Sequence, residues 1–139
     1  MGYIRTIMGV AGVVIWAGVS STGTLAAGDP VKGKSAFGIC KACHSLEEGK
    51  KTIGPSLFKV VGRQAGIVEK YKYSPDYVTA GEKGLKWTEE NISNYLKNPK
   101  KFLAAYLEKK KVKSRMATKI RQADKRNNIA AYLASIFKE

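Results

Sequence analysis

Apolar residues recur at helical spacing through the C-terminal half of the chain. Thr88, a residue type favoured at helix N-caps, precedes the first such segment. Asn98-Pro99 predicts the start of a second helix, because proline suits the first helical position, and the basic run at 109–113 ends it. A third helix is predicted over residues 123–137. The apolar positions of these segments are Ile92, Tyr95 and Leu96; Phe102, Leu103, Tyr106 and Leu107; and Ile129, Tyr132, Leu133 and Ile136.

The first half of the chain has a different pattern. A helix that contains Gly and Ala is predicted over residues 31–44, and residues 45–84 are predicted to be one long loop, because glycine and proline interrupt them so often. Such a loop is uncommon in a compact domain, and it is understandable if it wraps around a large group that is not protein. No segment alternates as a strand would. We therefore expect an all-α domain of about four to five helices joined by long loops.

The N-terminal segment has the order of a secretory signal peptide. Arg5 is followed by an uncharged apolar run at 7–19 and then by small residues up to Ala26-Ala27. The run is shorter than the roughly 20 residues that a membrane span needs. Residues 1–27 are therefore predicted to be a cleaved leader, with an uncleaved anchor as the alternative, and residues 28–139 to be the working domain.

Composition narrows the chemistry that this domain can carry. The 139 residues are 44% hydrophobic and 26% charged, which fits one globular domain. Two cysteines are too few for a disulfide framework, and a single histidine excludes sites that need several imidazoles. Of the three methionines, only Met116 lies beyond the predicted leader.

The candidate chemistry lies in Cys40-Lys41-Ala42-Cys43-His44. Two cysteines separated by two residues and followed at once by histidine are the motif of covalent haem c attachment. Each thiol adds to a vinyl group of haem, and His44 becomes the proximal iron ligand. Three other interpretations compete: a zinc site, which lacks a fourth Cys or His; a thioredoxin-like redox pair, which lacks a βαβ setting; and a plain disulfide, which leaves His44 unexplained.

Met116 is the candidate sixth ligand of the iron. Electron-transfer haems use His or Met opposite the proximal His, and the chain has no second His. The competing interpretations are that Met116 fills the core, and that the iron is open or bound by Lys. A thioether ligand raises the reduction potential, which suits a carrier at the high-potential end of an electron-transfer chain.

The sequence resembles class I cytochrome c, in particular the longer bacterial forms called cytochrome c2. Besides the haem motif, the resemblance is carried by matching residues spread over most of 29–138. They are Gly33, Phe37, Gly54-Pro55-Ser56-Leu57, Gly62-Arg63, Tyr71 to Ser74, Leu85 to Thr88, Asn91 to Lys100, Ser114-Arg115-Met116 and Ile129 to Leu133. The interval between Pro99 and Met116 is longer than in the mitochondrial form and is similar to the long-insert bacterial type.

The resemblance implies a class I cytochrome c fold around one covalently bound haem c, and an electron-transfer protein rather than an enzyme. It implies that the first and last helices cross, with Gly33 and Phe37 against Ile129 and Tyr132. It also assigns roles near the haem. The carbonyl of Pro55 is expected to accept the second N–H of His44; Arg63, Tyr73 and Trp87, with Ser114 as an addition, to hydrogen-bond the haem propionates; and Tyr95 to lie beside the Met116 ligand. For Tyr73, Trp87 and Tyr95, simple core packing is the competing interpretation.

The charge of the chain points to an acidic partner. The sequence has 25 Lys and Arg against 11 Asp and Glu, and cations near His44 and Met116 would steer the protein to acidic docking surfaces. We expect a periplasmic monomer that shuttles single electrons from a cytochrome bc-type complex to a cytochrome c oxidase or a photosynthetic reaction centre. Secretion argues against nucleic acid, and anionic lipid is a milder alternative. The rival function is a haem c protein with an open distal site, either ligand-binding or peroxidase-like.

Overall fold

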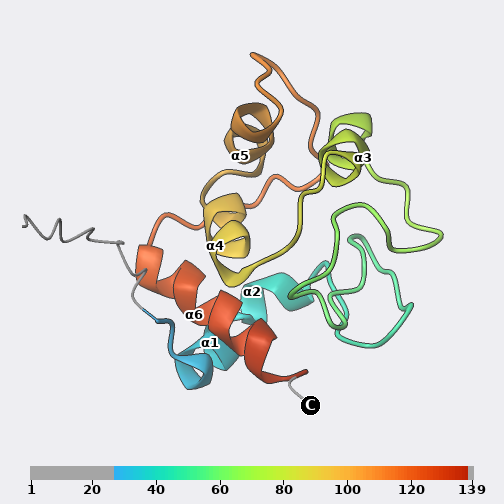
Figure 1. The fold of residues 1–139 in the computed structure, drawn as a ribbon. Helices are drawn as coiled ribbons and strands as arrows, with labels where there is room; N and C mark the ends of the chain where they lie inside the picture. The colour runs from blue at the N-terminus through green and yellow to red at the C-terminus, as the bar shows by residue number, and fades with distance from the viewer. Residues whose placement is uncertain (1–26, 138–139) are drawn as a thin grey trace, which may run out of the picture.

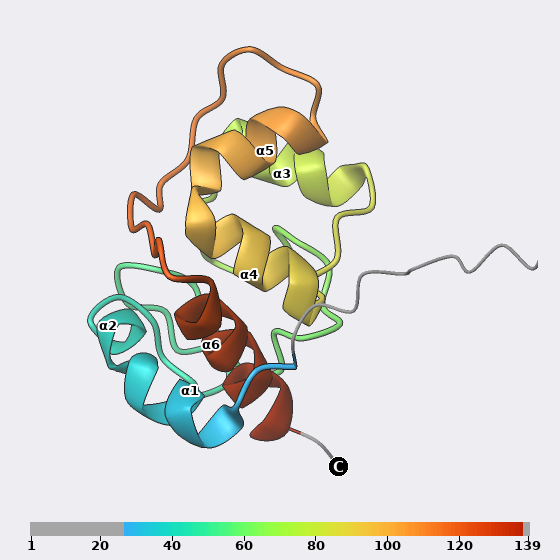
Figure 2. The same cartoon turned by 90° about the vertical axis from the view of Figure 1, so that its left-hand side faces the viewer.

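The computed structural model describes residues 27–137 (Figures 1 and 2). This part of the chain contains six helices and, instead of strands, a single isolated bridge between Gln64 and Lys86. The prediction of an all-α domain is therefore confirmed, although the described residues contain one helix more than the four to five that were expected. The helices are α1 (Pro30–Ala36), α2 (Gly38–Lys41), α3 (Pro75–Glu82), α4 (Glu89–Lys97), α5 (Pro99–Tyr106) and α6 (Ala123–Ser135).

The predicted helix starts in the C-terminal half are confirmed. The Thr88 hydroxyl accepts a hydrogen bond of 3.1 Å from the Asn91 amide at the start of α4. The Asn98 side chain accepts one of 3.2 Å from the Lys101 amide at the start of α5, where Pro99 follows the cap. Each bond satisfies one of the amides that a helix N-terminus leaves without a partner.

Helices α1 and α6 pack across each other at one end of the molecule (Figures 1 and 2). A Cβ atom at Gly33 would collide with the backbone carbonyl of Asn128, so only glycine permits so close a crossing. The rings of Phe37 and Tyr132 meet with their centroids 5.4 Å apart, and Ile129 is buried beside them. The crossing implied by the resemblance is therefore present.

Two predicted boundaries are wrong. The helix expected over 31–44 is interrupted at Phe37 and ends at Lys41, so His44 lies beyond α2 and not within it. The region 45–84, expected to be loop throughout, contains α3. Ser74-Pro75 resembles a turn in the sequence, but Ser74 is the N-cap of α3 and Pro75 begins the helix.

The long segment between α5 and α6 arches beyond α5 and returns past α3 (Figures 1 and 2). It includes the basic run, and it carries Met116 back toward the centre of the molecule. No helix in the range 27–137 is both long enough and apolar enough to cross a membrane. The predicted leader, apart from Ala27, lies outside the described residues.

Candidate haem site

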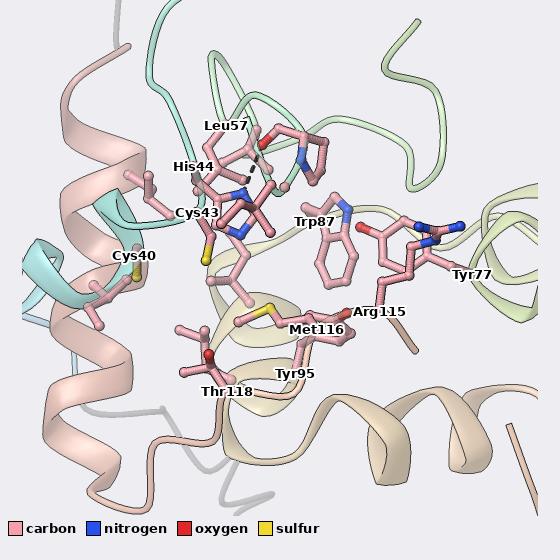
Figure 3. Close-up of a pocket in the computed structure, with 18 of the residues that line it drawn as sticks. Cys40, Cys43, His44, Leu57, Tyr77, Trp87, Tyr95, Arg115, Met116 and Thr118 are labelled. Carbon is pink, nitrogen blue, oxygen red and sulfur yellow. Dashed lines mark hydrogen bonds between the residues drawn. The ribbon is translucent and has the colours of Figure 1, made fainter. Parts of the chain in front are cut away.

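A cavity of about 330 Å³ lies at the centre of the fold and is lined mainly by apolar side chains (Figure 3). Its walls come from α2, from the loop that follows it, from α3, α4 and α6, and from the segment that carries Met116. Close-packed protein interiors contain few voids larger than a water molecule. A cavity of this volume is of the size that binds a cofactor or another small molecule.

Both cysteines of the Cys40–His44 motif line this cavity. Cys40 is buried in α2, and Cys43 follows one residue after the α2 C-cap. The amides of Cys43 and His44 both donate to the Cys40 carbonyl, at 3.1 and 2.9 Å, which folds the motif into a compact turn. Burial raises the pKa of Cys40 to about 11, partly opposed by the charge of Lys125, so this thiol is neutral at pH 7.

Contacts with Gly54 and Pro55 fix the orientation of the His44 ring. Its Nδ1 atom lies 2.8 Å from the carbonyl oxygen of Pro55, which is the contact that the resemblance implies. A Cβ atom at Gly54 would collide with the same ring, so glycine at this position lets the imidazole lie against the backbone. Burial lowers the pKa of His44, although the Pro55 bond opposes this, and the ring is therefore neutral at pH 7, the form that binds metal ions.

Met116 faces the cavity from the side opposite His44 (Figure 3). Tyr95 lies next to it, and burial raises the pKa of the Tyr95 hydroxyl to about 12, while a hydrogen bond with Ser114 acts in the other direction. Ser114 also donates to the Met116 carbonyl at 3.1 Å. An imidazole nitrogen and a thioether sulfur thus lie on opposite sides of one apolar space.

Three further candidates lie in the cavity wall: Arg63, Tyr73 and Trp87. The Arg63 guanidinium donates to the carbonyls of Phe58 at 2.7 Å and Ser56 at 2.8 Å. A guanidinium has five N–H donors, more than these two bonds use. Burial lowers the Arg63 pKa, yet this group stays protonated at any ordinary pH. It therefore places a positive charge in a wall that is mainly apolar.

The structure brings nine of the ten sequence-predicted site residues to the cavity, and Ser114 is the one that does not line it. Sequence reasoning missed Tyr77, which lies in the wall between Tyr73, with ring centroids 4.8 Å apart, and Trp87, at 5.8 Å. Tyr77 is on α3, the helix that the sequence does not predict, so no periodicity marked it. Leu57, Ile92 and Leu133 also line the cavity; they lie in stretches that carry the resemblance, but nothing in the sequence marked them as site residues.

The residues present fit a covalently attached haem. Two free thiols could form the thioether bonds, while the neutral imidazole of His44 and the thioether of Met116 could both ligate its iron. The apolar wall would cover the faces of the macrocycle, and Arg63 would balance anionic substituents at its edge. A site for a bare metal ion is a poorer fit, because within residues 27–137 no three His, Cys, Asp or Glu side chains gather closely enough to hold one.

Comparison with known proteins identifies the family. No protein-family model matches the chain. Cytochrome c-551 of Roseobacter denitrificans is 41% identical over 131 residues, which cover 89% of this chain and 92% of that protein. Cytochrome c2 of Rhodobacter capsulatus is 43% identical over 120 residues, or 81% of this chain and 85% of that one. The structure of cytochrome c2 from Rhodospirillum centenum matches with a TM-score of 0.73 at 39% identity and covers 77% of this chain and 97% of its own.

These likenesses extend over most of the chain that builds the cavity. They favour the haem interpretation of Cys40 and Cys43 over the zinc, thioredoxin-like and disulfide ones, because a c-type cytochrome uses such a pair for haem. The chain belongs to the cytochrome c2 family of class I c-type cytochromes, which are haem proteins of electron transport and not enzymes.

Proposed function

We propose that this protein is a periplasmic monohaem carrier whose haem c is attached through Cys40 and Cys43 and ligated by His44 and Met116. The observation that carries the proposal is that His44 and Met116 face each other across a cavity that both cysteines line. Haem c supplies one iron that accepts and releases a single electron. The protein's own residues hold that iron in place and set its surroundings.

Each ligand has a residue that orients it. Pro55 accepts the Nδ1–H of His44, which leaves Nε2 free for the iron and increases the basicity of the ring. Tyr95 and Ser114 lie beside Met116 and restrict the positions that its thioether can take. The buried apolar residues of the wall would shield a bound haem from water.

The polar part of the wall is proposed to hold the haem propionates. Arg63 contributes charge, and Tyr73 and Trp87 contribute an O–H and an N–H donor that apolar packing alone would not require. Ser114 lies outside the cavity wall, so in this proposal its hydroxyl acts through Tyr95 and the Met116 carbonyl instead of through a propionate.

Localisation follows from the leader and the haem. Residues 1–27 have the order of a signal peptide, and covalent attachment prevents loss of haem outside the cytoplasm. We expect residues 28–139 to be the mature domain, and the mass of the native protein separates a cleaved leader from a retained anchor.

The partners are proposed to be acidic surfaces of a cytochrome bc-type complex as donor, and of a cytochrome c oxidase or photosynthetic reaction centre as acceptor. Thirteen basic residues flank the two ligand segments or the insert, and their field would raise association rates at low salt. They are Lys41, Lys50, Lys51, Lys59, Lys97, Lys100, Lys101, Lys109, Lys110, Lys111, Lys113, Arg115 and Lys119.

Met116→Ala tests the ligand assignment. The variant should have a lower midpoint potential, and its ferric form should bind added imidazole readily, because the iron loses its thioether. Val112→Ala, a half-buried apolar truncation in the same segment, is the control and should change neither property. A Met116→Ala protein with the wild-type potential would remove Met116 from the ligand set and favour the open-site alternative.

Replacing Lys110 and Lys111 with Gln tests the docking surface. Both side chains are exposed in the insert. Electron transfer to an acidic partner should slow, and the rate should depend less steeply on salt, because fewer charges are screened. Unchanged rates and an unchanged salt slope would place the docking surface elsewhere.

A further inference from the structure

The start of α3 holds the insert through the backbone of one residue, Lys113. One oxygen of Asp76, Oδ2, accepts from the amide of Lys113 at 2.7 Å, and Ser74 Oγ donates to the Lys113 carbonyl at 2.8 Å. The other oxygen, Oδ1, accepts from Lys109 Nζ at 2.8 Å. Both backbone polar groups of Lys113 are therefore bonded to side chains that lie far away in the sequence.

These contacts combine an ion pair with hydrogen bonds to the backbone. The Asp76 side chain is only 15% exposed, and Ser74 is buried at 7%. The hydrogen bond from Lys109, with that from the Lys113 amide, lowers the pKa of Asp76, so the carboxylate is charged at neutral pH. Hydrogen bonds to a charged group of this kind are stronger than those between neutral groups.

The backbone of the segment that carries Met116 has few other hydrogen bonds. Within the described part of the chain, no backbone-to-backbone hydrogen bond involves residues 110–119. Ser114, next to Lys113, is hydrogen-bonded with Tyr95 through its side chain, and the next backbone anchor is Ile120, whose amide donates to the Leu96 carbonyl at 2.8 Å. Met116 lies between the backbone anchors at Lys113 and Ile120, three residues beyond Lys113.

We propose that Asp76, with Ser74, is a positioning residue for the Met116 ligand. The inference rests on the proposed function, since it requires Met116 at the iron. Three residues span at most about 11 Å of chain, so release of Lys113 gives Met116 freedom to leave the iron without unfolding α5 or α6. The carboxylate at the start of α3 thereby determines how well another ligand competes with Met116.

Imidazole titration of the ferric holoprotein tests the proposal, with the sulfur-to-iron absorption band as the signal for bound Met116. Asp76→Ala should raise the apparent affinity for imidazole by about tenfold, because imidazole must displace Met116. Ser74→Ala and Lys109→Gln each remove one contact and should raise it by about threefold. Lys109 is 47% exposed, so its replacement does not endanger folding.

Glu82→Gln is the matched control, because it removes one negative charge from the exposed last turn of the same helix. It should leave the imidazole affinity unchanged. The proposal is overturned if Asp76→Ala, Ser74→Ala and Lys109→Gln all titrate like Glu82→Gln while the wild type shows the sulfur-to-iron band. If Asp76→Ala does not accumulate as holoprotein, unchanged affinity in the other two variants has the same meaning.

The titration separates a failure of the proposed function, Met116 ligation, from a failure of the positioning role of Asp76. A wild-type ferric protein without the sulfur-to-iron band contradicts Met116 ligation and, with it, the positioning role of Asp76. A wild-type band with unshifted variants contradicts the positioning role alone.

Discussion

Substitution of Gly54 by alanine should lower the free energy of unfolding of the holoprotein, because it crowds the His44 ring. The backbone of Gly54 does not need a positive φ, so alanine can adopt its conformation, but the new methyl group would collide with Cε1 and Nδ1 of His44. The ring has little room to retreat. Its Nδ1 is hydrogen-bonded to Pro55, and the opposite nitrogen is the one proposed to bind the iron.

The expected loss follows from these contacts. Forcing a methyl group into a packed site costs about 1–3 kcal/mol. If the ring moves away from the Pro55 carbonyl, an unpaired buried polar group adds about 1–3 kcal/mol. Alanine recovers about 0.4–1 kcal/mol by restricting the unfolded chain. The free energy of unfolding of the holoprotein should therefore fall by about 1–5 kcal/mol.

Urea unfolding of the ferric holoprotein measures this loss, and Gly38→Ala is the matched control. Gly38 begins α2 close to the same haem motif, yet a Cβ atom there would meet nothing within 4 Å. Gly38→Ala should be as stable as the wild type or more stable by about 0.4–1 kcal/mol. The reasoning is refuted if Gly54→Ala unfolds at the same urea concentration as Gly38→Ala.

Two other predictions concern stability away from the ligands. Leu103→Ala should cost about 2–5 kcal/mol in urea unfolding, because the side chain is fully buried in α5; an equal effect from Val31→Ala, at a position 79% exposed, would contradict this. Stability should also depend on pH through Asp76, whose pKa is lowered in the folded protein. Its contribution is complete above the unfolded pKa of about 3.9 and is lost as the pH falls through the folded pKa. The difference in free energy of unfolding between wild type and Asp76→Asn should accordingly shrink on acidification. A difference that stays constant from pH 7 down to acid unfolding would contradict a contribution from the Asp76 carboxylate.

The helices that the sequence predicts correctly are those with strong local signals. Caps at Thr88 and Asn98, together with apolar residues at helical spacing, define α4 and α5. Helix α3 has only eight residues, begins at a Ser-Pro pair that resembles a turn in the sequence, and lacks a clear apolar stripe, since it buries only Ala80 and Gly81. Its position depends on packing against distant segments, which periodicity does not report.

The site divides in the same way. Cys40, Cys43 and His44 are adjacent in sequence, so their chemistry is visible there, and the scarcity of His and Met singles out Met116. The bonds of Arg63 to Phe58 and Ser56, and the contact of Asp76 with Lys113, join residues by tertiary folding. No local pattern encodes contacts of that kind.

The central claim is a covalent haem c with Met116 at the iron, and an optical spectrum tests it most directly. The protein, made with haem-attachment machinery and exported, would be examined oxidised and reduced, and then again after denaturing extraction of free haem. We predict that colour stays with the polypeptide and that the native ferric protein shows the sulfur-to-iron band. Covalent colour without that band would contradict Met116 ligation, and a colourless polypeptide would contradict the haem assignment itself.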